Sequence, residues 1–130
     1  MNKEQYVSYE IAKLLKEKGF CEENVYCYYQ GDYKNDSTDI WRGECKFNWN
    51  IYDDSYSAPT QQMAMSWLEE TYSFFIEISR SIDLNGNYHY FYMILDKTCK
   101  YVSSASKDNN YSSKSDAVEA ALEYILTKLI

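Results

Sequence analysis

Tyrosine is the residue type that most distinguishes this sequence, because fifteen of its 130 residues are tyrosines. The tyrosine side chain combines a large apolar ring with a hydroxyl group and loses little conformational entropy on binding, so it is enriched at protein interfaces. Tyrosines also cover sheets that are half exposed to water. The densest group lies between residues 26 and 56. It therefore predicts either a binding surface or a partly wet sheet face.

Acidic residues concentrate in the same part of the chain. Between Gly19 and Glu77 there are eleven Asp and Glu residues and three Lys and Arg residues, a local net charge of -8 (3 − 11), while the whole chain carries -7. Such a field repels nucleic-acid phosphates and attracts basic surfaces, although it can also serve solubility alone. We predict a protein partner with a basic surface and no nucleic acid. The candidate interaction surface consists of Tyr26, Tyr28, Tyr29, Tyr33, Asp39, Asp53, Asp54 and Tyr56.

The cysteines do not form a recognisable metal or catalytic motif. Cys21, Cys27, Cys45 and Cys99 are far apart, and the single histidine, His89, is distant from all four. Structural zinc sites place ligands in closely spaced pairs. The N-terminus has no apolar signal core, so we expect reduced thiols that fill the core and bind no metal.

No motif in the sequence predicts catalysis. The adjacent acids Glu22-Glu23, Asp53-Asp54 and Glu69-Glu70 point to different sides of a strand or helix, so none is a ready acid/base pair. A P-loop, an EF-hand, a G-x-S-x-G and an H-E-x-x-H motif are all absent from the sequence. We therefore expect a protein that is not an enzyme and needs no cofactor.

Composition predicts one globular domain over residues 1–130. Hydrophobic residues make up 45% and aromatic residues 18%, with one proline, which excludes disordered and low-complexity chains. No apolar run reaches the roughly 18 residues of a membrane span. Together with the missing signal core, this predicts a cytoplasmic protein that does not bind membranes.

Three segments have the pattern of helices. Residues 3–18 carry an apolar stripe, and Gly19 is suited to a left-handed stop with Phe20 folding back on the last turn. Thr60 is a cap for a second helix, and Ser113 with Asp116 forms a capping box for a third that runs to the end of the chain.

Four segments have the pattern of strands. The first two are residues 25–29 and 40–49, after which residues 52–57 are predicted to be a polar connection. The other two, 73–82 and 87–95, flank Asn85-Gly86, a pair that favours a hairpin with a type I′ turn.

The resulting order, α-β-β-α-β-β-α, predicts an α+β fold in which helices pack on an antiparallel sheet of about four strands. Within the second hairpin, the strand 87–95 is apolar or aromatic on both faces. We therefore expect it to be a central strand, or one that is covered on both sides.

The second half of the chain resembles a family of short uncharacterised proteins of gut bacteria and their phages. The similar segments are Ser57-Ala58-Pro59-Thr60, Trp67-Leu68-Glu69-Glu70 and Ile76-Glu77-Ile78, followed by a glycine turn, a Tyr-rich strand and a Ser-capped helix over 113–130. The resemblance covers residues 57–130. It implies an α+β fold in a bacterial or phage cytoplasm and supplies no activity or catalytic residues.

Two functional hypotheses follow from these observations. In the first, the chain is a small acidic, Tyr-rich protein-binding module, a phage or mobile-element modulator of a host protein, with a homo-oligomer also compatible. In the second, it binds a small ligand, nucleotide-like or otherwise planar, in an aromatic pocket between sheet and helices.

Overall fold

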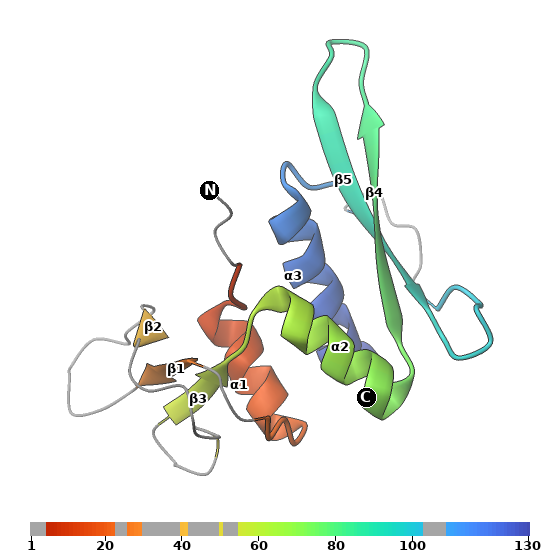
Figure 1. Cartoon of the computed structure of the whole chain (residues 1–130). Helices are drawn as coiled ribbons and strands as arrows, with labels where there is room; N and C mark the ends of the chain where they lie inside the picture. The colour runs from red at the N-terminus through yellow and green to blue at the C-terminus, as the bar shows by residue number, and fades with distance from the viewer. Residues whose placement is uncertain (1–4, 23–25, 30–39, 42–49, 51–54, 103–108) are drawn as a thin grey trace. The chain divides into compact units, whose positions relative to one another are not determined.

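The computed structural model describes residues 5–22, 26–29, 40–41, 50, 55–102 and 109–130 (Figure 1). The protein is α+β. Its described elements are, in chain order, α1 (Tyr9–Glu17), β1 (Tyr26–Tyr29), β2 (Ile40–Trp41), β3 (Ser55–Ala58), α2 (Gln61–Tyr72), β4 (Phe75–Ile82), β5 (Tyr88–Leu95), α3 (Lys114–Tyr124) and the π-helical segment η2 (Ile125–Leu129).

The described strands form two antiparallel sheets, one of three strands in the order β2-β1-β3 and one of two strands, β4-β5. The predicted single sheet of about four strands and its element order are therefore not confirmed. The chain divides into two compact units, Met1–Ala64 with Ile130 and Met65–Leu129, so the boundary falls inside α2. The single domain over residues 1–130 stays a prediction. None of the described helices has the length and apolarity that crossing a membrane requires.

In the first unit, α1 begins at Tyr9, later than the predicted start at residue 3. The reason is Ser8, whose hydroxyl oxygen accepts the Ile11 N–H at 3.3 Å and caps the helix. The preceding residues are extended instead, and the Val7 N–H donates to the Pro59 carbonyl at 3.0 Å. Val7 is nevertheless fully buried, so the apolar stripe correctly identified a core residue outside the helix.

The predicted helix stop at Gly19 is confirmed. Gly19 has a φ of +92°, and the Phe20 N–H donates back to the Leu15 carbonyl at 3.0 Å while the Gly19 N–H donates to Lys16. These two bonds satisfy carbonyls that the end of the helix would otherwise leave open. Phe20 is thereby held in the core of this unit, where α1 packs on β3.

The strand β3 corrects the prediction of a polar connection over residues 52–57. Ser55–Ala58 pairs with β1, and the side chains of Ser55 and Ser57 are 2% and 0% exposed. On the other edge, the Asn50 side-chain oxygen accepts the Ser57 N–H at 2.8 Å. Serine has no strand signal of its own, so this strand exists because its backbone finds partners on both sides. Of the predicted strand 40–49, β2 covers Ile40–Trp41, and the rest lies outside the described residues.

In the second unit, α3 packs on the β4–β5 hairpin, as predicted. Ala117 and Ala121 are fully buried on α3, and Ile94 is fully buried on β5. Small residues on a helix allow its backbone to approach a sheet closely, and this accounts for the fit. The Ser113 hydroxyl caps α3 by accepting the Asp116 N–H at 3.1 Å, which confirms the predicted start. The α-helical geometry changes to π-helical at Ile125, short of the predicted uniform helix.

Candidate protein interface

The predicted surface lies partly on the β1–β3 ladder of the first unit. The register places Tyr28 directly opposite Tyr56, with Tyr26 and Tyr29 in the same strand opposite Ala58 and Ser55. Four of the eight predicted residues therefore belong to one pair of strands. The other four, Tyr33, Asp39, Asp53 and Asp54, lie outside the described residues.

Tyr56 is fixed in place by α1. Its ring makes an edge-to-face contact with the Tyr9 ring at a centroid distance of 5.5 Å, and the Lys16 Nζ lies 4.8 Å from its centroid. Lys16 is itself oriented by donating to the Ser55 carbonyl at 2.9 Å. Tyr56 stays half-exposed under these contacts. An aromatic ring that is already ordered loses little further entropy when a partner covers it, which suits an anchoring role.

A second exposed region, which the sequence analysis did not identify, is the tip of the β4–β5 hairpin, residues 82–88. Figure 1 shows the hairpin extending beyond the end of α3. Ile82 is 60% exposed, Tyr88 is 51% exposed, and Leu84 is completely exposed. The Arg80 guanidinium lies over the Tyr88 ring at 4.2 Å. The sequence feature that could have predicted this exposed region is the pair of aliphatic residues, Ile82 and Leu84, in a turn that is otherwise polar.

The turn at this tip differs from the predicted type I′ turn. The Gly86 N–H donates to the Asp83 carbonyl at 3.1 Å and the Asp83 N–H donates to the Asn87 carbonyl at 2.9 Å. Gly86 has a φ of +83°, whereas Asn85 does not have the positive φ that a type I′ turn requires. The connection is thus a three-residue loop with a left-handed glycine. The hairpin is confirmed, and its predicted turn type is wrong.

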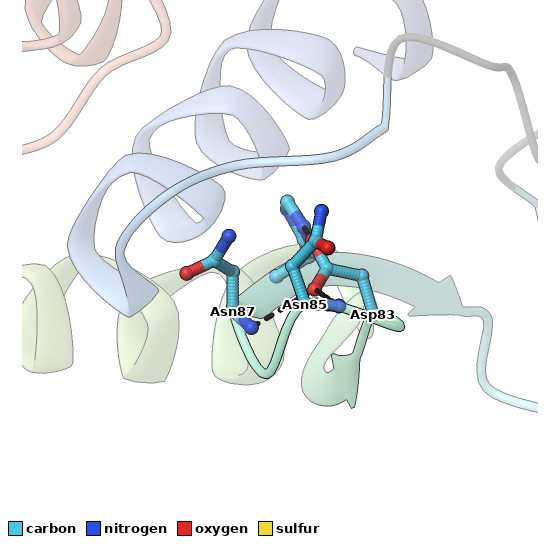
Figure 2. A network of polar contacts seen from close by, with 4 residues as sticks. Asp83, Asn85 and Asn87 are labelled. Atoms are coloured by element: carbon cyan, nitrogen blue, oxygen red, sulfur yellow. Dashed lines mark hydrogen bonds and ion pairs between the residues drawn. The ribbon is translucent and has the colours of Figure 1, made fainter.

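Asp83 explains the choice of turn. Its Oδ1 accepts the N–H groups of Asn85 at 2.8 Å and Asn87 at 2.9 Å, as Figure 2 shows. Its Oδ2 lies 2.9 Å from the His89 Nε2, which ties the turn to the start of β5. These bonds stabilise the carboxylate, so they lower the pKa of Asp83, with the His89 contact contributing most and the Asn87 N–H next.

The same turn recurs at the other end of β5. The Asp96 N–H donates to the Lys100 carbonyl and the Cys99 N–H donates to the Asp96 carbonyl, both at 2.9 Å. The Asp96 Oδ1 accepts the Thr98 hydroxyl at 2.7 Å and the N–H groups of Thr98 and Lys100. These bonds lower the pKa of Asp96, the Thr98 hydroxyl first. Cys99, with a φ of +63°, occupies the position that Gly86 occupies at the tip.

The far edge of β5 is bonded by other segments, but the described sheet has only the two strands β4 and β5, so the prediction of a central strand is not confirmed. Tyr90 exchanges both backbone hydrogen bonds with Tyr111, at 2.8 and 2.7 Å. The Asn109 side-chain amide then takes the place of a strand residue, because its oxygen accepts the Tyr92 N–H at 3.0 Å and its nitrogen donates to the Tyr92 carbonyl at 2.8 Å. The Val102 N–H continues the edge by donating to the Ile94 carbonyl.

Two of the four cysteines depart from the prediction of buried core residues. Cys21 and Cys99 are free thiols and both are exposed, because one follows the helix stop and the other lies in the left-handed position of a turn. Cys27 lies in β1 opposite Ser57, and Cys45 lies outside the described residues. Among the residues that the structure describes, no three His, Cys, Asp or Glu side chains gather where they could hold a metal ion.

Comparison of the chain with family models, with curated proteins and with solved structures finds no match in any of the three. The resemblance to a family of gut-bacterial and phage proteins therefore stays a prediction.

Proposed function

We propose that this chain is a protein-binding module that docks its acidic, Tyr-rich region, residues 22–56, on a basic surface of a partner protein. The observation that carries the proposal is the pairing of Tyr28 with Tyr56 in the β1–β3 ladder, within a region of eight acidic and three basic side chains, a net charge of -5 (3 − 8). The ladder also includes Tyr26 and Tyr29.

In this proposal the charged groups determine the rate of association, and the aromatic groups determine the rate of dissociation. The carboxylates raise the rate of encounter with a basic surface, because long-range attraction acts before contact. The tyrosines then hold the complex, because desolvated aromatic side chains dominate the binding energy of most interfaces. In line with the family resemblance, the proposal extends to a cytoplasmic phage or mobile-element protein that modulates a host protein.

The experiment is an affinity pull-down followed by binding kinetics with the partner obtained. We expect the double variant Asp53→Lys/Asp54→Lys to slow association and to reduce its dependence on salt. We expect Tyr28→Ala to speed dissociation, with a loss of about 1–2 kcal/mol, the range of an interface hot spot. The matched control is Glu69→Lys/Glu70→Lys, which makes the same change of charge on exposed residues of α2, outside the region.

If the two charge-reversal pairs changed the association rate equally, the acidic residues within 22–56 would have no specific role in binding and would serve only solubility. Unchanged kinetics in Tyr28→Ala would remove the anchoring role. A thermal-shift screen with nucleotides and other planar metabolites tests the small-ligand hypothesis, which predicts a concentration-dependent rise in melting temperature without any protein partner.

A further inference from the structure

Within the described residues, the backbone groups on the outer edge of β4 have no hydrogen-bond partners. The Asp83 N–H donates to the Asn87 carbonyl, so these two residues form a hydrogen-bonded pair. Such pairs alternate along an antiparallel ladder, and the backbone groups of residues 81, 79, 77 and 75 of β4 therefore also point toward β5. The residues between them direct their N–H and C=O groups away from β5. Tyr90 and Tyr92 agree with this alternation, because they use their backbone groups on the far edge of β5. No described residue bonds to the outer row, which consists of Ile76, Ile78, Arg80 and Ile82.

Apart from the charged residues Glu77 and Arg80, this edge lacks the usual devices that prevent strand addition. Exposed edges in natural proteins are kept short, twisted by a bulge, interrupted by proline or lined with lysine. β4 is eight residues long, its register with β5 is continuous, and its sequence has no proline, glycine or lysine. Phe75 is 40% exposed and Ile82 is 60% exposed on the same strand. Such an edge is suited to main-chain pairing with another strand.

We propose that a second copy of this chain occupies the edge, by antiparallel pairing of β4 with β4 around a two-fold axis. The result is a continuous four-stranded sheet in the order β5-β4-β4-β5. Pairing of this kind is self-complementary and closes at two copies, since each β4 presents the same edge to the other. This inference is independent of the proposed function, because β4 lies outside residues 22–56.

Charge restricts the register of this pairing. Only the outer-row residues direct backbone groups toward the second copy, so each of them must lie opposite an outer-row residue of the other β4. The two-fold axis therefore passes through a residue of β4 and not between two residues. An axis at Glu77 would place two carboxylates opposite each other, and an axis at Arg80 would place two guanidinium groups together. Like charges directly opposite are destabilising. Among the four middle positions of β4, whose registers pair the most residues of the strand, those that remain centre on Ile78 or Ser79, both uncharged.

The apolar residues of the hairpin tip explain why the partner is another copy. In the register centred on Ser79, Ile82 lies opposite Ile76 of the second copy, and Leu84 lies level with Phe74 of the second copy. The exposed aliphatic side chains at the hairpin tip of one copy thus lie beside apolar residues at the start of β4 in the other copy. Because the pairing is symmetric, the same contacts form twice. The tip residues that the hairpin itself leaves exposed acquire partners in this way.

The first test is the molar mass of the full chain by sedimentation equilibrium across a micromolar to millimolar series. We expect the mass to rise from 15.4 kDa toward twice that value. Arg80→Pro removes one outward N–H from each copy without touching a bond to β5, and the lost hydrogen bonds should raise the dissociation constant about tenfold or more. Arg80→Ala is the matched control. It loses the guanidinium group and its contact with Tyr88 but keeps the N–H, so we expect it to dimerise.

The second test needs no variant and covers the case in which Arg80→Pro does not fold. Residue-resolved amide exchange at low and high protein concentration should show protection of Ile76, Ile78, Arg80 and Ile82 that appears with concentration, while Glu77, Ser79 and Ser81 are protected throughout. A chain that stays monomeric at millimolar concentration would overturn the proposal. So would a dimer in which the outer-row amides gain no protection, since it would form elsewhere, for example through residues 22–56.

Discussion

At the scale of single residues, the two Asp turns around β5 form an internal comparison. Gly86 and Cys99 occupy the same position and both have positive φ, +83° and +63°. Glycine adopts this conformation without steric cost, whereas a residue with a Cβ atom is strained there by about 1 kcal/mol or more. The turn at the hairpin tip is thus free of backbone strain at Gly86, whereas the Asp96 turn at the other end of β5 is strained at Cys99.

We expect Gly86→Ala to lower the free energy of unfolding by about 1 kcal/mol, and Cys99→Gly to raise it by less, because a glycine also increases the entropy of the unfolded chain. A Cβ at Gly86 would meet no atom within 4 Å, so the loss comes from the backbone alone. Urea denaturation measures both changes. Cys99→Ser removes the thiol but keeps the strain and should match wild type. If Cys99→Gly were destabilising, the turn would owe its conformation to the cysteine side chain.

At the scale of elements, β5 organises the second unit. Its near edge pairs with β4, and its far edge is completed by residues that are distant in sequence, among them the side chain of Asn109. Its two ends are each closed by a carboxylate that accepts backbone N–H groups. The hairpin tip is ordered by hydrogen bonds although it carries exposed apolar side chains, which separates it from an ordinary loose turn.

Asn109→Ala should cost about 1–3 kcal/mol of stability, because it leaves both the N–H and the carbonyl of the buried Tyr92 backbone unpaired. Thermal or urea unfolding measures the loss. The matched control is Asn110→Ala, an exposed neighbour, for which we expect a change within the error of the measurement. Equal effects of the two substitutions would show that water replaces the Asn109 amide without loss.

The turn carboxylates predict acid sensitivity. Both Asp83 and Asp96 have a pKa below the ordinary 3.8 in the folded chain, since hydrogen bonds from His89 and from the Thr98 hydroxyl stabilise their charged forms. Their contribution to stability is therefore complete above pH 3.8 and is lost as the pH falls through the lowered values. Melting temperature measured against pH should decline in this window. We expect Asp83→Asn/Asp96→Asn to flatten the decline, while Asn85→Ala, which leaves both carboxylates intact, keeps it.

At the scale of the whole molecule, the two proposed associations differ in electrostatics. Two copies of a chain with a net charge of -7 repel each other, whereas an acidic region and a basic partner attract. Salt screens both effects, over about 8 Å at 0.15 M. We thus expect added NaCl to tighten the β4–β4 dimer and to slow association with the basic partner. Sedimentation and binding kinetics over one salt series measure the two trends. A dimer that weakens with salt would require ion pairs at its interface.

The local chemistry of this chain was readable from its sequence wherever the signal was confined to a few neighbouring residues. Gly19 ends α1, Ser113 caps α3, and Asn85-Gly86 marks the hairpin. In each case a backbone group finds its partner within five residues, so no distant contact is needed to decide the outcome. The apolar runs also identified β5 as a strand, but not its place in a two-stranded sheet.

The tertiary structure decided the features that depend on distant partners. Ser55–Ala58 is a strand because β1 and Asn50 bond to its two edges, although its serines carry no strand signal. The turn at the tip took its form from Asp83 and His89, which the Asn-Gly pair alone does not specify. The outer edge of β4, to which no described residue bonds, likewise emerges only once the pairing of β5 is known. Composition and local spacing determine which groups a chain possesses, and long-range hydrogen bonding determines which of them are left to meet a partner.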